Sequence, residues 1–132
     1  MSPRGSAPVV LDASAVLALL AEEPGADQVE ELLEGAVMST VNLSEVLEKS
    51  VQHGIETKGL EHDLGALGVH LEPFDVIQSR AAAELWESAP RAGLSFGDRA
   101  CLALASGLDG LAVTTDRRWT TLSLGVRVQV VR

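Results

Sequence analysis

The chain has 132 residues, of which 46% are hydrophobic and 22% are charged. A chain of this length and composition forms one folded domain, because it is too apolar to stay disordered and too short for two domains. Its 19 acidic residues outnumber its 10 basic residues, which gives a net charge of −9 at pH 7. This charge repels nucleic acid on average, so binding of RNA or DNA requires a local basic edge or bound cations.

The beginning of the chain contains a lead-in and a first buried strand. Residues 1–7 are expected to form a flexible lead-in, and residues 8–132 a single domain. Residues 9–11 are an unbroken apolar run, which is typical of a strand buried on both faces. A helical spacing of apolar residues begins directly after Asp12. Asp12 is therefore predicted to lie at the carboxyl end of a strand.

A second helix and a second strand follow. Pro24 and Gly25 are expected to open the helix, and Gly35 to end it. Residues 36–39 then form a short apolar run that predicts another strand. Helices and buried strands therefore begin to alternate.

The third predicted helix carries an acidic residue at the edge of its buried side. Thr40 or Asn42 is expected to cap this helix. Its apolar side is predicted to hold Val41, Val46, Leu47 and Val51. Glu45 comes one residue before Val46, so it lies within or beside the apolar stripe. An acid in that position requires an explanation, which can be structural or functional.

The rest of the chain continues the same alternation. We predict a shorter helix within residues 53–68, a strand over 69–71, a helix from 75 to about 89, a loop over 90–97, a helix over 98–106, and strands over 111–114 and 126–130. Regular alternation of this kind predicts an α/β fold in three layers, with a central, mostly parallel sheet of about five strands covered by helices on both faces.

Four acidic residues are expected to meet at one edge of this sheet. Asp12 and Asp116 follow the carboxyl ends of strands, where α/β folds bind their ligands. Asp98 lies in the first turn of a helix that follows a long loop, and Glu45 lies near the start of the helix after the second strand. Because carboxylates repel one another at short range, their convergence predicts coordination of Mg²⁺ or Mn²⁺, which prefer oxygen ligands.

Each acid also has a structural explanation. Asp12 and Asp116 can cap helices, and Asp98 can interact with the positive end of a helix dipole. Ser14 and Thr114 each lie two residues from one of the strand-end acids. Their hydroxyl groups are equally suited to orienting a carboxylate and to capping.

The remaining residue types narrow the chemistry. A single cysteine, Cys101, excludes an internal disulfide framework and a Cys-rich zinc site. We expect it to be a small buried helix residue. His53, His62 and His70 all lie between the Glu45 helix and the third strand, so they are interpreted as surface residues and an imidazole acid–base pair is not expected. Trp86 and Trp119 are expected to pack in the core.

No apolar stretch is long enough to cross a membrane. The longest, over residues 16–21, is far shorter than the ~20 residues that a membrane helix requires. We therefore expect a soluble cytoplasmic protein with no membrane partner.

Four segments resemble one known family. Similarity to PIN-domain ribonucleases, in particular to the VapC toxins of bacterial toxin–antitoxin pairs, lies in residues 10–15 (VLDASA), 41–46 (VNLSEV), 94–105 (LSFGDRACLALA) and 114–119 (TTDRRW). The segments span nearly the whole chain in the family's order. Their combination and spacing are far more specific than any one of them.

The resemblance implies a function for the four acids. Asp12, Glu45, Asp98 and Asp116 match the family's metal-binding and catalytic acids, and Ser14 and Thr114 its supporting hydroxyl positions. It thereby implies a metal-dependent endoribonuclease that uses Mg²⁺ or Mn²⁺ to hydrolyse RNA phosphodiester bonds. Some members have a further acid shortly after the position of Asp116, where this chain has arginines, so the number of metal ions, one or two, is left open.

The resemblance also implies partners. It implies an RNA substrate, usually tRNA or rRNA, a homodimer, and inhibition by a cognate VapB-like antitoxin. Apolar residues of the first two helices and of the stretch to about Gly68 are candidates for the antitoxin groove. Arg99, Arg117 and Arg118, which directly follow Asp98 and Asp116, are candidates for contacts to RNA phosphates, although they can equally neutralise the acids or project into solvent.

Two other classes of protein compete with this interpretation. Phosphoryl-accepting domains also place an aspartate at a strand end, but receiver domains need a lysine after the last strand, and the lysines here are Lys49 and Lys58. Dehalogenase-type phosphatases need a second aspartate two residues after the first, where this chain has Ser14. The non-enzymatic alternative is a catalytically idle PIN-like module that binds other proteins.

Overall fold

The computed structural model describes residues 7–132. Apart from Ala7, the predicted lead-in over residues 1–7 lies outside this range. The elements in chain order are β1 (Val9–Leu11), α1 (Ala13–Leu20), α2 (Ala26–Leu32), β2 (Val37–Ser39), α3 (Thr40–Gln52), α4 (Leu60–Ala66), β3 (His70–Glu72), α5 (Val76–Ser88), α6 (Phe96–Gly107), β4 (Leu111–Thr114), the 3₁₀ helix η1 (Arg117–Thr121) and β5 (Arg127–Val130). The predicted alternation of helices and strands is confirmed.

The strands form one parallel sheet in the order β3-β2-β1-β4-β5. The chain runs from β1 outward through β2 to β3, and then returns to the other side of β1 to add β4 and β5. The direction of the connections therefore reverses between β1 and β4. In open α/β sheets, ligands bind outside the carboxyl ends of the strands at such a reversal.

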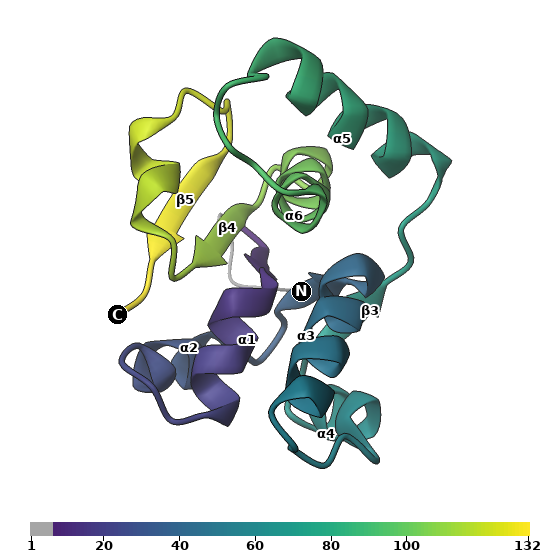
Figure 1. Cartoon of the computed structure of the whole chain (residues 1–132), viewed down its shortest axis with the longest axis vertical. Coiled ribbons are helices and arrows are strands. Elements are labelled where there is room, and N and C mark those ends of the chain that lie inside the picture. The colour runs from purple at the N-terminus through teal and green to yellow at the C-terminus, as the bar shows by residue number, and fades with distance from the viewer. Residues whose placement is uncertain (1–6) are drawn as a thin grey trace.

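Helices cover both faces of the sheet, which gives the three-layer α/β/α fold that was predicted. In Figure 1, α5 and α6 lie on one side of the sheet and α1 to α4 on the other. Adjacent strand residues point to opposite faces. Val10 packs in the cluster built around α6, and Leu11 packs in the cluster built around α1, α2, α3 and α4. Both faces are thus apolar, as the unbroken strand runs predicted.

Several helix boundaries depend on caps that the sequence pattern did not identify. The cap of α3 is Ser39, whose hydroxyl accepts a hydrogen bond from the Val41 amide, so the expected cap at Thr40 or Asn42 is wrong. The helix predicted from Asp98 begins at Phe96, because Ser95 and Asp98 form a reciprocal capping box.

Two apolar residues do not pack as predicted. Trp86 on α5 is 57% exposed and Val51 on α3 is 64% exposed, so neither belongs to the core. Trp119, by contrast, is 1% exposed and packs in the α6 cluster, and Cys101 is fully buried in α6, as predicted. The three histidines are exposed, which confirms their assignment to the surface.

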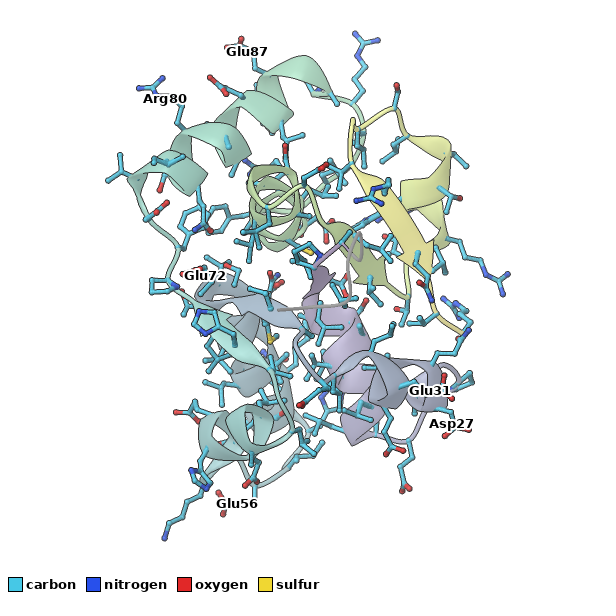
Figure 2. All side chains as sticks on the ribbon, turned by 180° about the vertical axis from the view of Figure 1, so that it is seen from behind. Asp27, Glu31, Glu56, Glu72, Arg80 and Glu87 are labelled. Atoms are coloured by element: carbon cyan, nitrogen blue, oxygen red, sulfur yellow. The ribbon has the colours of Figure 1, made fainter. Side chains whose placement is uncertain are left out.

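Many of the acidic residues lie on the outer surfaces of helices and loops. Figure 2 shows Asp27 and Glu31 on α2 and Glu87 on α5 pointing away from the body of the molecule. Between residues 7 and 132, no helix combines the length and apolarity needed to cross a membrane.

Candidate metal centre and active site

Asp12 is the most deeply buried of the four predicted acids. It follows β1 and caps α1, where its Oδ1 accepts a hydrogen bond of 2.8 Å from the Ala15 amide. The residue is only 5% exposed. Its backbone amide donates to the Val113 carbonyl of β4, so the side chain lies at the carboxyl ends of the two strands between which the connections reverse.

Two hydroxyl groups orient the Asp12 carboxylate, and both were predicted. Thr114 Oγ1 donates to Asp12 Oδ2 at 2.6 Å, and Ser14 Oγ lies 2.7 Å from Oδ1. Each hydroxyl oxygen also accepts a backbone hydrogen bond, Thr114 from the Asp116 amide and Ser14 from the Thr115 amide. Because these amides occupy the acceptor side of the hydroxyls, the hydroxyl hydrogens point to the carboxylate.

The pKa of Asp12 reflects its burial. The pKa is raised from 3.8 to about 6, chiefly because burial disfavours the charged form. Hydrogen bonds from Thr114, Ala15 and Ser14 oppose this increase, and the negative charge of Asp98 adds to it. No basic side chain forms an ion pair with Asp12 within the described part of the chain. The carboxylate is therefore neutralised only in part by its surroundings.

Glu45 and Asp98 line the same pocket as Asp12. This pocket has a volume of about 140 Å³ and is lined by Asp12, Ala13, Ser14, Leu17, Asn42, Glu45, Lys49, Ser95 and Asp98. Glu45 comes from α3 and Asp98 from the first turn of α6, and these two helices contact each other. Three of the four predicted acids thus converge from positions far apart in the sequence.

The charges of the same three acids also act on the buried thiol of Cys101. Burial raises the pKa of Cys101 well above its usual value, and the charges of Asp12, Asp98 and Glu45 raise it further. A single side chain one turn along α6 from Asp98 therefore experiences all three carboxylates.

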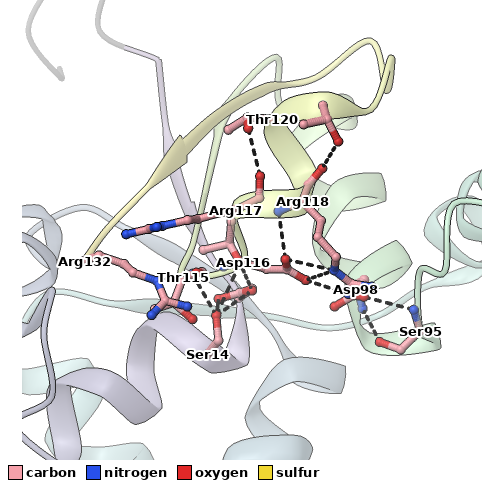
Figure 3. Close-up of polar contacts among 12 residues, drawn as sticks. Ser14, Ser95, Asp98, Thr115, Asp116, Arg117, Arg118, Thr120 and Arg132 are labelled. Atoms are coloured by element: carbon pink, nitrogen blue, oxygen red, sulfur yellow. Dashed lines mark hydrogen bonds and ion pairs between the residues drawn. The ribbon is translucent and has the colours of Figure 1, made fainter.

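Asp116 is placed differently from the other three acids. Its carboxylate turns to Arg118, whose Nη2 lies 2.7 Å from Asp116 Oδ2, and it is absent from the lining of the pocket. The hydrogen bond from the Arg118 side chain lowers the pKa of Asp116. Figure 3 shows Asp116 above Ser14, with the Arg118 side chain extending toward Asp98. Asp116 is therefore adjacent to the site but already paired with a cation.

The three arginines proposed to contact RNA also occupy different environments. Arg99 Nη1 donates to the Ala82 carbonyl of α5, and its guanidinium lies over the Phe96 ring, so this side chain faces α5. Arg118 is bound to Asp116, and Arg117 is exposed at the start of η1. Only Arg117 and Arg118 lie on the segment that borders Asp116.

Sequence reasoning missed two residues of the pocket. The sequence pattern indicated Asn42 only as a cap and gave Lys49 no place in the site, yet both line the pocket. They lie three residues before and four residues after Glu45 on α3. Residues at these spacings share a helix face, so this periodicity could have identified them.

The oxygen atoms that line the pocket suit a hard divalent cation. Three carboxylates line the pocket, and Asn42 Oδ1 is a buried oxygen acceptor without a hydrogen-bond donor in the described structure. Oxygen ligands of this kind are those that Mg²⁺ and Mn²⁺ prefer. As placed within residues 7–132, no three acidic, histidine or cysteine side chains are yet close enough together to hold an ion. Metal binding at this site would therefore require adjustment of side-chain rotamers.

A larger hollow lies elsewhere and does not share this chemistry. It has a volume of about 700 Å³ and lies beside the turn between α1 and α2, where Glu22, Glu23, Asp27, Glu30 and Arg132 line it. Glu22 and Glu23 are exposed to solvent, as is Asp27. The smaller pocket combines the buried Asp12, the half-buried Glu45 and Asp98, and the reversal point of the sheet.

A family model provides the identification. The model of the PIN domain matches residues 9–123. The chain belongs to the PIN-domain family. No curated protein is similar enough in sequence to count as a match.

Solved structures share the fold at low sequence identity. A chain of a toxin–antitoxin complex from Klebsiella pneumoniae superposes with a TM-score of 0.73 at 14% identity, over 92% of this chain and 96% of that chain. A chain of DNA-bound VapBC from Salmonella typhimurium gives a TM-score of 0.72 at 14% identity, over 94% and 98%. FitAcB from Neisseria gonorrhoeae gives 0.65 at 20% identity, over 91% and 95%. These three structures share the fold of this chain over nearly its whole length.

Proposed function

We propose that this PIN-domain protein is a metal-dependent endoribonuclease that hydrolyses RNA phosphodiester bonds and acts as the cytoplasmic toxin of a type II toxin–antitoxin system. The observation that carries the proposal is the pocket at the reversal point of the sheet. There, Asp12 is buried without an ion-paired cation, and Glu45 and Asp98 line the same cavity.

Asp12, Glu45 and Asp98 would hold the metal ion. When bound, Mg²⁺ or Mn²⁺ supplies Lewis-acid stabilisation of the charge that develops on the phosphodiester and makes water a stronger nucleophile near neutral pH. Ser14 and Thr114 keep the Asp12 carboxylate oriented toward the pocket. Asp116 would add a further carboxylate to the site if it were released from Arg118, so the number of ions held would depend on that ion pair.

The proposed substrate is structured RNA such as tRNA or rRNA. Arg117 and Arg118 lie next to Asp116 at the edge of the site, where their positive charge would attract phosphates against the negative field of the chain. Arg99 faces α5, so we assign it to the packing of α5 against α6 rather than to RNA.

The proposed protein partners are a VapB-like antitoxin and a second copy of the chain. The similar structures from Klebsiella pneumoniae and Salmonella typhimurium are described as a toxin–antitoxin complex and as DNA-bound VapBC. The region predicted to hold the antitoxin groove exposes four apolar side chains. They are Leu20 at the end of α1, Val51 in α3, Ile55 in the loop after α3 and Leu67 directly after α4. Apolar residues exposed in this way are typical of interaction surfaces.

Cleavage of structured RNA by the purified protein tests the enzymatic part of the proposal. We expect cleavage with Mg²⁺ or Mn²⁺, none in EDTA, and loss of cleavage in Asp12→Asn and Asp98→Asn. Asp75→Asn is the matched control, because Asp75 is also a helix-capping aspartate but lies outside the pocket. Absence of metal-dependent cleavage by the wild type, with RNA of either class, would instead support the catalytically idle PIN-like interaction module.

A further inference from the structure

Asn42 connects two of the helices that build the pocket. It lies in the first turn of α3, is fully buried, and its amide nitrogen makes two hydrogen bonds. Nδ2 donates to Glu45 Oε1 at 2.9 Å and to the Gly97 carbonyl of α6 at 3.0 Å. One amide group therefore joins the Glu45 carboxylate to the amino-terminal turn of α6.

The orientation of this amide follows from its partners. A carboxylate oxygen and a backbone carbonyl can only accept hydrogen bonds, so the nitrogen rather than the oxygen of Asn42 must face them. Its Oδ1 is left buried without a donor. Asn42 therefore leaves one of its own polar atoms without a hydrogen bond. The bonds that it does make hold the Glu45 carboxylate in place.

Gly97 provides the space that Glu45 occupies. A Cβ at residue 97 would overlap the Glu45 carboxylate. Gly97 is buried in α6 and does not have a positive φ, so its backbone conformation is open to other residues. Glycine weakens a helix relative to alanine, and here it leaves room for a carboxylate against the helix backbone.

We propose that Asn42 is a positioning residue and that, with Gly97, it forms a seat that fixes the Glu45 carboxylate for metal binding beside Asp12 and Asp98. This inference rests on the proposed metal-dependent function. Glu45 has a long side chain that is only half-buried, so without the seat its carboxylate would sample several rotamers. Groups that orient metal ligands in this way typically change metal affinity by about 10- to 100-fold.

The test is Mn²⁺ binding by the full chain without RNA, measured by calorimetry up to millimolar metal. Asn42→Ala and Gly97→Ala are each prepared alone and combined with Glu45→Gln. We expect each single variant to bind Mn²⁺ about 10- to 100-fold more weakly than the wild type. In the Glu45→Gln background the same substitutions should cause little further loss, because the carboxylate that they position is absent.

Two features of the design separate positioning from general damage. Ser50→Ala is the matched control, because Ser50 is a buried polar residue of the same helix with no hydrogen-bond partner for its hydroxyl in the described structure, and its loss should leave affinity unchanged. Gly97→Ala favours the helix and would displace only the far end of the Glu45 side chain, so it decides the question if Asn42→Ala does not fold.

The outcomes distinguish this inference from the proposed function. Wild-type affinity in both alanine variants, or an equal loss with and without the Glu45 carboxylate, overturns the seat while leaving the metal centre intact. A wild-type protein that binds no Mn²⁺ overturns the proposed function, and the inference fails with it.

Discussion

Asp12 and Asp116 occupy equivalent positions in the fold but very different environments. Each follows a strand, β1 or β4, and each caps the helix that comes next. Asp12 is surrounded by hydroxyl and amide donors, and burial raises its pKa to about 6. Asp116 is held by Arg118, whose hydrogen bond lowers its pKa. An aspartate that follows a strand has its carboxylate at the edge of the sheet. The side chains around that carboxylate then determine whether it can bind a cation.

The difference assigns separate roles to the two aspartates. A buried carboxylate without an ion pair is costly unless a cation neutralises it, so Asp12 is suited to a metal ion. Asp116 already has its cation in Arg118 and must exchange one positive partner for another. The comparison therefore predicts that the site depends on Asp12 far more than on Asp116.

The largest expected effect is on RNA cleavage. Asp12→Asn should lower kcat/KM in Mn²⁺ by more than about 100-fold, because loss of a metal ligand should cost at least as much as loss of a group that merely orients one. Asp116→Asn should lower it by less than about 10-fold, because its carboxylate is turned to Arg118. Initial rates of cleavage of one RNA by the wild type and by both variants measure the two losses in kcat/KM. Equal losses would contradict the division of roles.

The second effect is on the pH dependence of stability without metal. Asp12 has a folded-state pKa of about 6 against 3.8 for its ordinary value, so its protonated form favours folding. Its stabilising contribution is complete below about pH 3.8 and is lost as the pH rises through about 6. Relative to Asp12→Asn, the wild type should therefore lose about 2 kcal/mol of unfolding free energy between pH 4 and 7.

Urea unfolding of both proteins in EDTA across this range measures that difference. Asp116→Asn provides the comparison with the opposite sign, because the lowered pKa of Asp116 stabilises the folded protein above its ordinary pKa and this contribution is lost as the pH falls. A wild type that gained stability relative to Asp12→Asn as the pH rose would show that Asp12 is not the cation-free carboxylate described above.

The third effect is stabilisation by metal. Mn²⁺ at 100 times its Kd should add about 2.7 kcal/mol to the unfolding free energy and raise Tm by several degrees. The gain should grow from pH 5 to pH 7, because Asp12 must lose its proton to bind metal. Asp116→Asn should retain most of the gain and Asp12→Asn should lose it. Thermal melts with and without Mn²⁺ provide the readout, and an unchanged Tm in the wild type would exclude a tight site.

The smallest effect is on RNA binding at the edge of the site. Arg117→Ala combined with Arg118→Ala should weaken RNA binding and reduce the salt dependence of log Kd by roughly 1 for each phosphate that the protein no longer neutralises. Mn²⁺ affinity without RNA should not fall, since neither arginine holds the metal. Arg80→Ala is the control, because Arg80 points outward from α5 (Figure 2). Unchanged RNA affinity in the double variant would remove both arginines from the interface.

Much of the architecture could be predicted from the sequence because the strands of a buried parallel sheet appear as short, unbroken runs of apolar residues. Apolar runs such as residues 9–11 and 111–114 identified β1 and β4, and the aspartate that follows each run within two residues located the edge of the sheet. The convergence of Asp12, Glu45 and Asp98 on one pocket followed from that topology. The pattern predicted both ends of β1 and β4, whereas β3, predicted over residues 69–71, lies one residue later, at His70–Glu72.

What the sequence did not reveal depends on side-chain geometry. The ion pair of Arg118 with Asp116 is a rotamer choice between neighbours two residues apart, and no periodicity reports it. Trp86 and Val51 were assigned to the core because apolar residues usually pack there, but both are exposed. Asn42 was overlooked because its polar character suggested a cap, whereas burial against α6 gives it another role.

The most direct test of the account is a crystal structure of the protein grown with Mn²⁺, in which anomalous scattering locates the ion. The account predicts an ion in the pocket, bound by Asp12, Glu45 and Asp98, with Ser14 and Thr114 still donating to Asp12. An ion found instead in the exposed acidic hollow beside the α1–α2 turn, with the Asp12 pocket free of metal at saturating Mn²⁺, would contradict it.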